Sequence, residues 1–338
     1  MLETLRDLCL INGISGDEKK VRDYIISRIE GKCQYKIDPM GNILAFKKGK
    51  AVPKNKVMMS AHMDEVGFIV TYICDNGYLK FTNVGGVDPK VALGRAVKVG
   101  DSVNGVIGAK VLHLTKGDEE KTVPALDKLY IDIGAKNKEE AEKLVSLGDP
   151  VYFVSDFVTF GKDKIKAKAI DDRFGCAIMI KLIESDLDYD CNFAFLVQEE
   201  VGCRGAAPAV FRVRPDYAIV LEATTASDIS GVSEENSVCV QGKGAVVSFM
   251  DRSTIYNRDL FRGAFALGKE KGIPVQTKTT VAGGNDAGAI HKACEGVYTI
   301  AVSLPCRYIH SGTSVGDVKD MTACFDLAKA LYEEYANA

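Results

Sequence analysis

The spacing of apolar residues predicts two amphipathic helices at the start of the chain. The first is short and covers Leu2–Leu10. The second runs to about Glu30 and carries Val21, Tyr24, Ile25 and Ile29 on one face. Ser15 and Glu18 match a capping box, in which each side chain would satisfy an amide of the other's turn. We therefore expect Ser15 to begin the second helix.

Strands and helices then alternate, apart from a central segment. Strands are predicted at Gln34–Ile37 and Ile43–Lys47, and Val57 opens a further apolar run. After Asp171 the candidate helices are Asp172–Ile183, Arg204–Phe211, Asn257–Lys271 and Lys319–Tyr335. Such alternation favours an α/β fold with a mixed central sheet flanked by helices.

The central segment, residues 67–161, has short strand patterns and frequent turns. The turns lie at Asp75-Asn76-Gly77, Gly85-Gly86, Gly100-Asp101 and Asn104-Gly105, and only Asn137–Leu147 has a helical pattern. Short strands with dense turns are typical of barrels. We expect a β-rich, barrel-like domain at 67–161 inserted into an α/β domain of residues 1–66 plus 162–338.

Composition narrows the possible function classes. The chain has 338 residues, 46% of them hydrophobic, and a net charge of -3, which gives no argument for nucleic acid or a membrane surface as partner. Charges within Met1–Asp7 argue against a signal peptide, and we find no apolar run long enough to span a bilayer. Ten scattered cysteines without a Cys-x-x-Cys pair are typical of a reducing compartment, so we expect a cytoplasmic protein.

Residues that can bind metal lie at or just beyond the ends of the apolar runs. They are His62 and Asp64 after Val57–Ala61, Asp171-Asp172 after Lys164–Ile170, Glu199-Glu200 after Phe193–Val197, Glu222 after Tyr217–Leu221, and His310 beyond Tyr298–Leu304. In open α/β sheets, sites form outside the carboxyl ends of the strands. The pattern therefore predicts a metal site.

The four histidines differ in their surroundings. His113 lies in a strand-like run and His291 at the end of a short helical pattern, and a structural role is favoured for both. His62 differs because Asp64 can accept its second ring proton, an arrangement typical of metal-binding histidines. Taken alone, the His-x-Asp pattern is equally compatible with a polar surface turn.

The adjacent carboxylates also have two interpretations. Glu199 and Glu200 would point in opposite directions on a strand, so one would hold metal and the other would face substrate; the alternative is a solvated strand end. Asp171 could bridge two cations while Asp172 or Arg173 orients it. Aspartates also favour a helix N-terminus, and both interpretations of this pair are compatible.

The charges are consistent with hydrolysis at two metal ions. Asp171, Glu200 and Glu222 would contribute minus three against plus four from two divalent cations, which favours a bound hydroxide. Glu199 would be the general base and then the acid for a departing amine. Mixed histidine and carboxylate ligation is typical of catalytic zinc, with cobalt or manganese as alternatives.

Five segments resemble the TET-type glutamyl/deblocking aminopeptidases, the co-catalytic enzymes of metallopeptidase family forty-two. They are Ser60–Gly67 (SAHMDEVG), Ala169–Gly175 (AIDDRFG), Gln198–Gly202 (QEEVG), Gly283–Gly288 (GGNDAG) and Arg307–Ser311 (RYIHS). The resemblance covers nearly the whole chain in matching order, including the inserted module.

The resemblance implies one metal on His62, Asp171 and Glu222, and the other on Asp171, Glu200 and His310. Asp171 would bridge, Glu199 would be the base and Asp64 would hold His62. It also implies a cis peptide after Asp171, a dimerisation role for the insert, and assembly into dimer-based homo-oligomers such as hollow tetrahedral dodecamers. Two positions depart from the pattern: Glu222 replaces the commoner aspartate, so metal spacing or affinity can differ, and Asn285 replaces a frequent threonine.

Removal of N-terminal residues from peptides with a free N-terminus is the leading hypothesis. A related two-metal carboxypeptidase or amino-acid deacylase is the main rival. A glucanase-type glycoside hydrolase ranks lower, because two adjacent glutamates do not naturally flank a sugar and the chain has no tryptophan. A catalytically silent scaffold is disfavoured because every expected ligand type is present.

Overall fold

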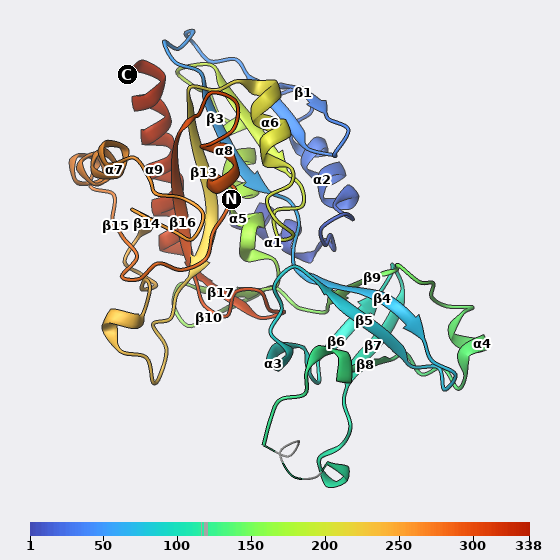
Figure 1. The fold of residues 1–338 in the computed structure, drawn as a ribbon. Coiled ribbons are helices and arrows are strands. Elements are labelled where there is room, and N and C mark those ends of the chain that lie inside the picture. Colours follow the sequence, from blue (N-terminus) through green and yellow to red (C-terminus); the bar gives the residue numbers. More distant parts are fainter. Residues whose placement is uncertain (116, 118–120) are drawn as a thin grey trace.

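The computed structural model describes residues 1–115, 117 and 121–338, and its largest unit is an eight-stranded mixed sheet (Figure 1). The strand order is β1-β2-β12-β3-β13-β16-β14-β15. The four central strands are mutually parallel: β12 (Cys191–Leu196), β3 (Val57–His62), β13 (Tyr217–Thr225) and β16 (Tyr298–Cys306). The outer strands are β1 (Gln34–Ile37), β2 (Ile43–Lys47), β14 (Ala245–Val247) and β15 (Val275–Gln276).

Helices cover both faces of this sheet because successive strand residues point to opposite sides. Met59 and Ala61 of β3 pack in one core with α1 (Leu2–Leu10), α2 (Lys19–Ile29), α5 (Ile170–Ile183) and α9 (Val318–Asn337). Helix α7 (Arg258–Lys271) packs against α9 on the same side. Met58 faces the other layer, made by α6 (Ala206–Val213) and α8 (Ala287–Ile290). The predicted mixed α/β sheet flanked by helices is confirmed.

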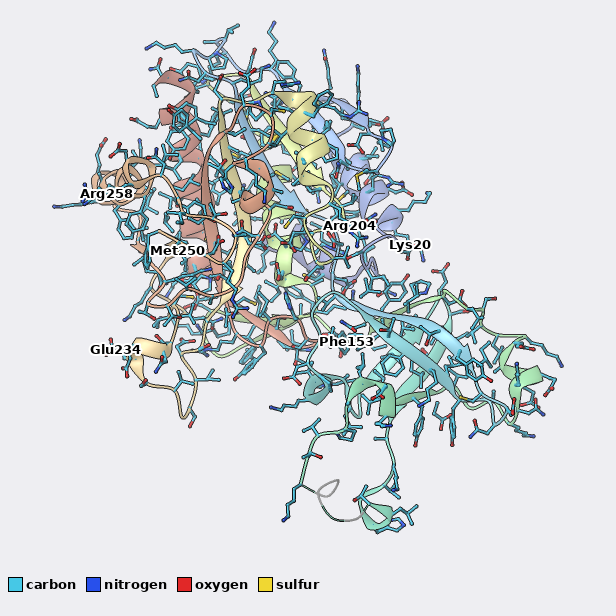
Figure 2. The ribbon with its side chains drawn as sticks, viewed as in Figure 1. Lys20, Phe153, Arg204, Glu234, Met250 and Arg258 are labelled. Atoms are coloured by element: carbon cyan, nitrogen blue, oxygen red, sulfur yellow. The ribbon has the colours of Figure 1, made fainter. Side chains whose placement is uncertain are left out.

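A closed six-stranded barrel lies beside the sheet domain and has its own core (Figure 1). Its strands run in the order β4 (Gly67–Ile73), β5 (Leu79–Val84), β8 (Tyr130–Asp132), β7 (Val103–Gly108), β6 (Ala96–Val99) and β9 (Pro150–Phe153), with short helices α3 (Pro89–Ala92) and α4 (Lys138–Ala141) between them. Phe153 lies where the barrel meets the sheet domain (Figure 2). The prediction of a barrel-like insert is confirmed, and the exact limits of the two domains stay a prediction.

A small antiparallel sheet connects the two units. It consists of β10 (Val158–Phe160), β11 (Lys164–Ala167) and β17 (Ser314–Asp317). β11 leads directly into α5, and β17 leads into α9. The chain therefore returns from the barrel immediately before Asp171. Single turns of 3-10 helix occur at Leu112–Leu114, Leu126–Lys128 and Glu234–Asn236.

Two predictions about helices were wrong. The capping box is absent: α2 begins at Lys19, and Ser15 Oγ donates instead to Asp64, while Glu18 accepts from the amides of Gly16 and Gln198. The helix expected at Asn137–Leu147 shortens to α4. Ala141 and Val145 of this segment still pack in the barrel core, whereas Leu144 and Leu147 are exposed.

His113 lies in a 3-10 turn and is exposed, rather than in a strand. His291, as predicted, follows a short helix: it caps α8, and its Nδ1 lies 2.7 Å from the Ala287 carbonyl oxygen. In the described part of the chain, no helix combines the length and the apolar character that a bilayer crossing needs.

Candidate metal centre

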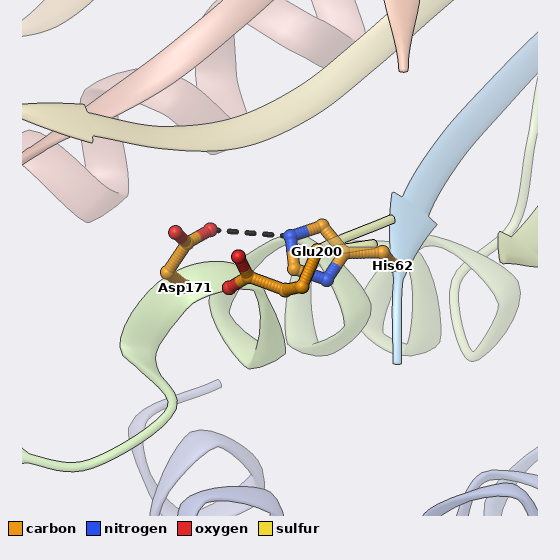
Figure 3. A group of neighbouring side chains, drawn as sticks. All are labelled: His62, Asp171 and Glu200. Carbon is orange, nitrogen blue, oxygen red and sulfur yellow. Dashed lines mark hydrogen bonds and ion pairs between the residues drawn. The ribbon is translucent and has the colours of Figure 1, made fainter. Parts of the chain in front are cut away.

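The predicted metal-binding residues come together at the carboxyl ends of the parallel strands. His62 is the last residue of β3, Asp171 lies in the first turn of α5, and Glu200 follows β12 (Figure 3). His310 follows β16. Glu222 lies within β13, which continues to Thr225, so it does not follow its strand as the sequence pattern indicated.

Asp171 lies between the two histidines, with one carboxylate oxygen facing each. Its Oδ1 is 3.2 Å from His62 Nε2, and its Oδ2 is 3.3 Å from His310 Nε2. Glu222 Oε1 is 3.4 Å from His62 Nε2, and Glu200 Oε2 is 3.3 Å from His310 Nε2. These contacts form two groups of ligands that share Asp171.

Backbone carbonyls orient both rings. His62 Nδ1 lies 3.1 Å from the Asp64 carbonyl oxygen, and His310 Nδ1 lies 3.0 Å from that of Gly86, in the loop after β5 of the barrel. If each Nδ1 donates a proton there, each Nε2 keeps its lone pair toward Asp171. The barrel thus orients one of the two histidines.

Asp64 fixes the turn that carries both glutamates. Its Oδ1 accepts from the Glu199 amide (3.1 Å), and its Oδ2 accepts from the Glu200 amide (3.1 Å) and from Ser15 Oγ (2.6 Å). Asp64 Oδ1 is also 3.4 Å from His62 Nδ1. Burial opposes ionisation of Asp64, but the His62 ring lowers the pKa of its carboxyl. Asp64 therefore positions three other site residues.

Asp172 and Arg173 make other contacts than the expected ones to Asp171. Asp172 accepts from the His62 amide (3.2 Å) and the Gly175 amide (3.0 Å), so it connects the end of β3 to α5. Arg173 is buried and donates to the carbonyls of Leu8, Ile11 and Gly13 rather than orienting Asp171. The Asp171–Asp172 peptide is cis, as the family resemblance implied.

The buried charges perturb one another strongly. Burial raises the pKa of Glu200 and of Glu222 well above the ordinary glutamate value. Burial opposes the charge of Asp171, but the rings of His310 and His62 lower the pKa of its carboxyl. Burial likewise opposes protonation of the histidines, yet neighbouring carboxylates raise the pKa of His62, and that of His310 to about 9.

This donor set suits divalent cations. Imidazole nitrogens and carboxylate oxygens are ligands for zinc, cobalt and manganese. In the described part of the chain, no lysine or arginine forms an ion pair with Asp171, Glu200 or Glu222. Ligand atoms of His62, Asp171 and Glu200 lie within 4.8 Å of one another, as do those of His62, Asp172 and Glu222. Metal ions would supply the missing positive charge.

A third acidic group, missed from the sequence, lies next to Glu199. Ligand atoms of Glu199, Cys203 and Asp286 fall within 4.8 Å of one another, and Cys203 Sγ donates to Glu199 Oε1 at 3.4 Å. Asp286 is buried, its Oδ1 has no hydrogen-bond partner among the described residues, and burial raises the pKa of its carboxyl. Its place in the GGNDAG segment was the only signal that could have indicated it.

A cavity of about 370 Å³ opens beside these side chains. Its walls include Asp171, Glu199, Glu200, Glu222 and His310, and also Lys278, which no sequence pattern indicated. A larger groove of about 900 Å³ lies against β1 and β2, but its lining contains no histidine. The smaller cavity is therefore the candidate site for substrate.

The family comparison agrees with this geometry. Residues 41–327 match the model of the M42 glutamyl aminopeptidases. The chain belongs to this family. M42 peptidases are hydrolases that act on peptides, and the predicted family resemblance is confirmed.

Curated relatives match over nearly their full length. A protein of Acetivibrio thermocellus with a provisional aminopeptidase name is 40% identical over 95% of both chains. The lysyl aminopeptidase of Pyrococcus furiosus is 30% identical, with 98% of this chain and 96% of the relative covered. The glutamyl aminopeptidase of Lactococcus lactis subsp. cremoris is also 30% identical, with 98% and 95% covered.

Solved structures share the whole architecture. The aminopeptidase APDkam598 of Desulfurococcus kamchatkensis superposes with a TM-score of 0.93 at 33% identity, covering 98% of this chain and 94% of that one. The TET1 peptidase of Pyrococcus horikoshii superposes with a TM-score of 0.87 at 34% sequence identity, and the superposition covers 98% of each chain. A Thermotoga maritima protein named endoglucanase superposes with a TM-score of 0.81 at 37% sequence identity, covering 98% of this chain and 97% of that one.

Proposed function

We propose that this M42 peptidase is a two-metal aminopeptidase that removes N-terminal residues from peptides. The observation that supports it most strongly is the Asp171 carboxylate, with one oxygen facing each histidine. A carboxylate in that position can bind two cations at once. The proposed ligands are His62, Asp171 and Glu222 for one ion, and Asp171, Glu200 and His310 for the other.

Zinc is the proposed metal, with cobalt and manganese as alternatives. Two such cations would lower the pKa of a water molecule and polarise the carbonyl of the scissile bond. Asp64 would keep the Glu199–Glu200 turn in place through its two amide contacts.

Glu199 is proposed to move the proton. Its Oε1 is engaged by Cys203, whereas Oε2 faces the centre, 4.0 Å from His62 Nε2. Burial raises the pKa of Glu199, which increases its affinity for a proton taken from the attacking water. The same oxygen would then return the proton to the departing amine.

The proposal is tested with one peptide in two forms, one with a free N-terminus and one acetylated. An aminopeptidase should cleave only the free form, and exhaustive chelation should abolish cleavage until zinc is restored. Equal hydrolysis of both peptides would reject an aminopeptidase, and full activity after chelation would reject the metal mechanism. The word endoglucanase occurs in the names of structural neighbours, and a cellulose oligomer added to the same assay tests that activity.

We further propose a cytoplasmic homo-oligomer built through the barrel. The Pyrococcus horikoshii TET1 peptidase is described as assembling into a tetrahedron or an octahedral shell, which supports a dimer-based tetrahedral dodecamer here. Barrel residues such as Val106 and Leu114 are exposed apolar side chains that an interface could cover. All ten cysteines are free, consistent with a reducing compartment. Light scattering that showed only a monomer would contradict the assembly.

A further inference from the structure

Lys278 contributes a cation to the wall of the cavity that holds the metal centre. It lies in the loop after β15 and is only 4% exposed, although it lines the cavity together with Glu222 and Thr224. Buried lysines are rare unless they are paired, because removing an ammonium from water is costly. A buried lysine beside a substrate cavity therefore requires an explanation.

The protein uses little of the hydrogen-bonding capacity of the Lys278 ammonium group. Lys278 Nζ donates to the Ala282 carbonyl oxygen at 3.1 Å, and no carboxylate of the described residues lies within ion-pair distance. An ammonium can donate three hydrogen bonds. Burial lowers the pKa of Lys278, and the charges of Asp251 and Glu222 oppose that effect only in part.

Among the described residues, neither nearby carboxylate forms an ion pair with Lys278, and each contacts other groups. Asp251 Oδ1 accepts from the Ser253 and Thr254 amides, and its Oδ2 accepts from Tyr256 Oη at 2.6 Å. Glu222 faces His62 and accepts from the Ala223 amide. The positive charge of Lys278 is therefore available to an anionic group that enters the cavity.

We propose that Lys278 selects substrates whose N-terminal residue has an acidic side chain. This inference rests on the proposed aminopeptidase function. In such a substrate the α-carboxyl of the first residue is part of the scissile peptide bond, so its only carboxylate is the side chain of aspartate or glutamate. Relatives include both a lysyl and a glutamyl aminopeptidase, so family membership alone leaves the choice open.

Charge and shape both favour this substrate class. A lysyl or arginyl side chain would bring a second cation to Lys278 and be repelled. Glutamine has nearly the shape of glutamate without its charge, so the ratio of glutamyl to glutaminyl hydrolysis isolates the contribution of Lys278. Hydrogen bonds to a charged partner predict a ratio of about 10 to 100 in kcat/KM.

The test uses the zinc-loaded protein and the p-nitroanilides of glutamate, glutamine, leucine and lysine. We expect the wild type to favour the glutamyl substrate, Lys278→Met to lose that preference while still cleaving the leucyl substrate, and Lys278→Arg to retain part of it. Lys278→Glu should shift the preference toward the lysyl substrate. Lys271→Met, at an exposed lysine of α7, is the matched control and should leave every ratio unchanged.

Equal glutamyl and glutaminyl rates in the wild type would overturn the proposal, as would a preference that survives in Lys278→Met. If the wild type cleaves none of the four substrates, the proposed function itself fails. Competitive inhibition of the wild type gives a second measurement that needs no variant. Free glutamate should inhibit about tenfold more strongly than free glutamine, and equal inhibition would also overturn the proposal.

Discussion

Two parts of one cavity wall are built in different ways. At the candidate metal centre, residues from β3, α5 and the segments after β12 and β16 are held by buried contacts, many of them to backbone groups. Lys278 lies in a loop and is held by one hydrogen bond. Many contacts between distant segments fix the first part, whereas the second part consists of a single side chain. Substitutions at the centre should therefore affect all substrates alike, and substitutions at Lys278 should affect their ranking.

The largest effect is expected for Asp171→Ala. Because Asp171 faces both histidines, its loss should remove both metals and reduce hydrolysis of every substrate to the level of the chelated wild type. Elemental analysis together with turnover of glutamyl and leucyl substrates measures this. Asp326→Ala, at an exposed aspartate of α9, is the control and should keep full metal content. An Asp171→Ala protein with two bound metals would refute the bridging role.

Glu199→Gln should separate chemistry from metal binding. The variant should keep both metals but lose about 10²–10⁴-fold in kcat, because glutamine cannot accept the proton. The loss should be the same for glutamyl and leucyl substrates, unlike the loss in Lys278→Met. Glu235→Gln, at an exposed position, serves as the control. Loss of metal from Glu199→Gln would contradict the division of roles between Glu199 and Glu200.

The smallest effect is a pH dependence of stability in the chelated protein. Carboxylates raise the pKa of His62 and His310, so the folded state binds these protons more tightly than the unfolded state. The resulting stability is present below the ordinary histidine pKa of 6.5 and is lost as pH rises through about 9. The raised pKa values of Glu200 and Glu222 act in the same direction.

The melting temperature of the chelated protein should therefore fall by a few degrees between pH 6.5 and pH 9. With zinc present the trend should reverse, because metal binding requires deprotonated ligands. His310→Ala should reduce the fall in the chelated protein, whereas His113→Ala, at an exposed histidine, should not change it. A melting temperature that rises with pH after chelation would contradict the assigned charge states.

The sequence predicted the parts whose signal is local. Strand and helix periodicity placed α1, β1 and β2 at their observed bounds, and the ends of apolar runs indicated His62, Asp171 and Glu200. Predictions failed where a distant partner competes with a local one. Ser15 bonds Asp64, 49 residues away in sequence, instead of capping α2. The helical pattern after Asn137 continues only to Ala141, and Val145 packs in the barrel core from outside the helix.

The residue types and their order along the chain determined the fold class, the barrel insert and the identity of the metal-binding candidates, because hydrophobic periodicity and polar strand ends are properties of short segments. Only the tertiary structure decided which oxygen of Asp171 faces which histidine, that the barrel loop at Gly86 orients His310, and that Lys278 is buried at the same cavity. These outcomes depend on contacts between segments far apart in the chain, and the strength of each charge depends on the burial that such contacts create.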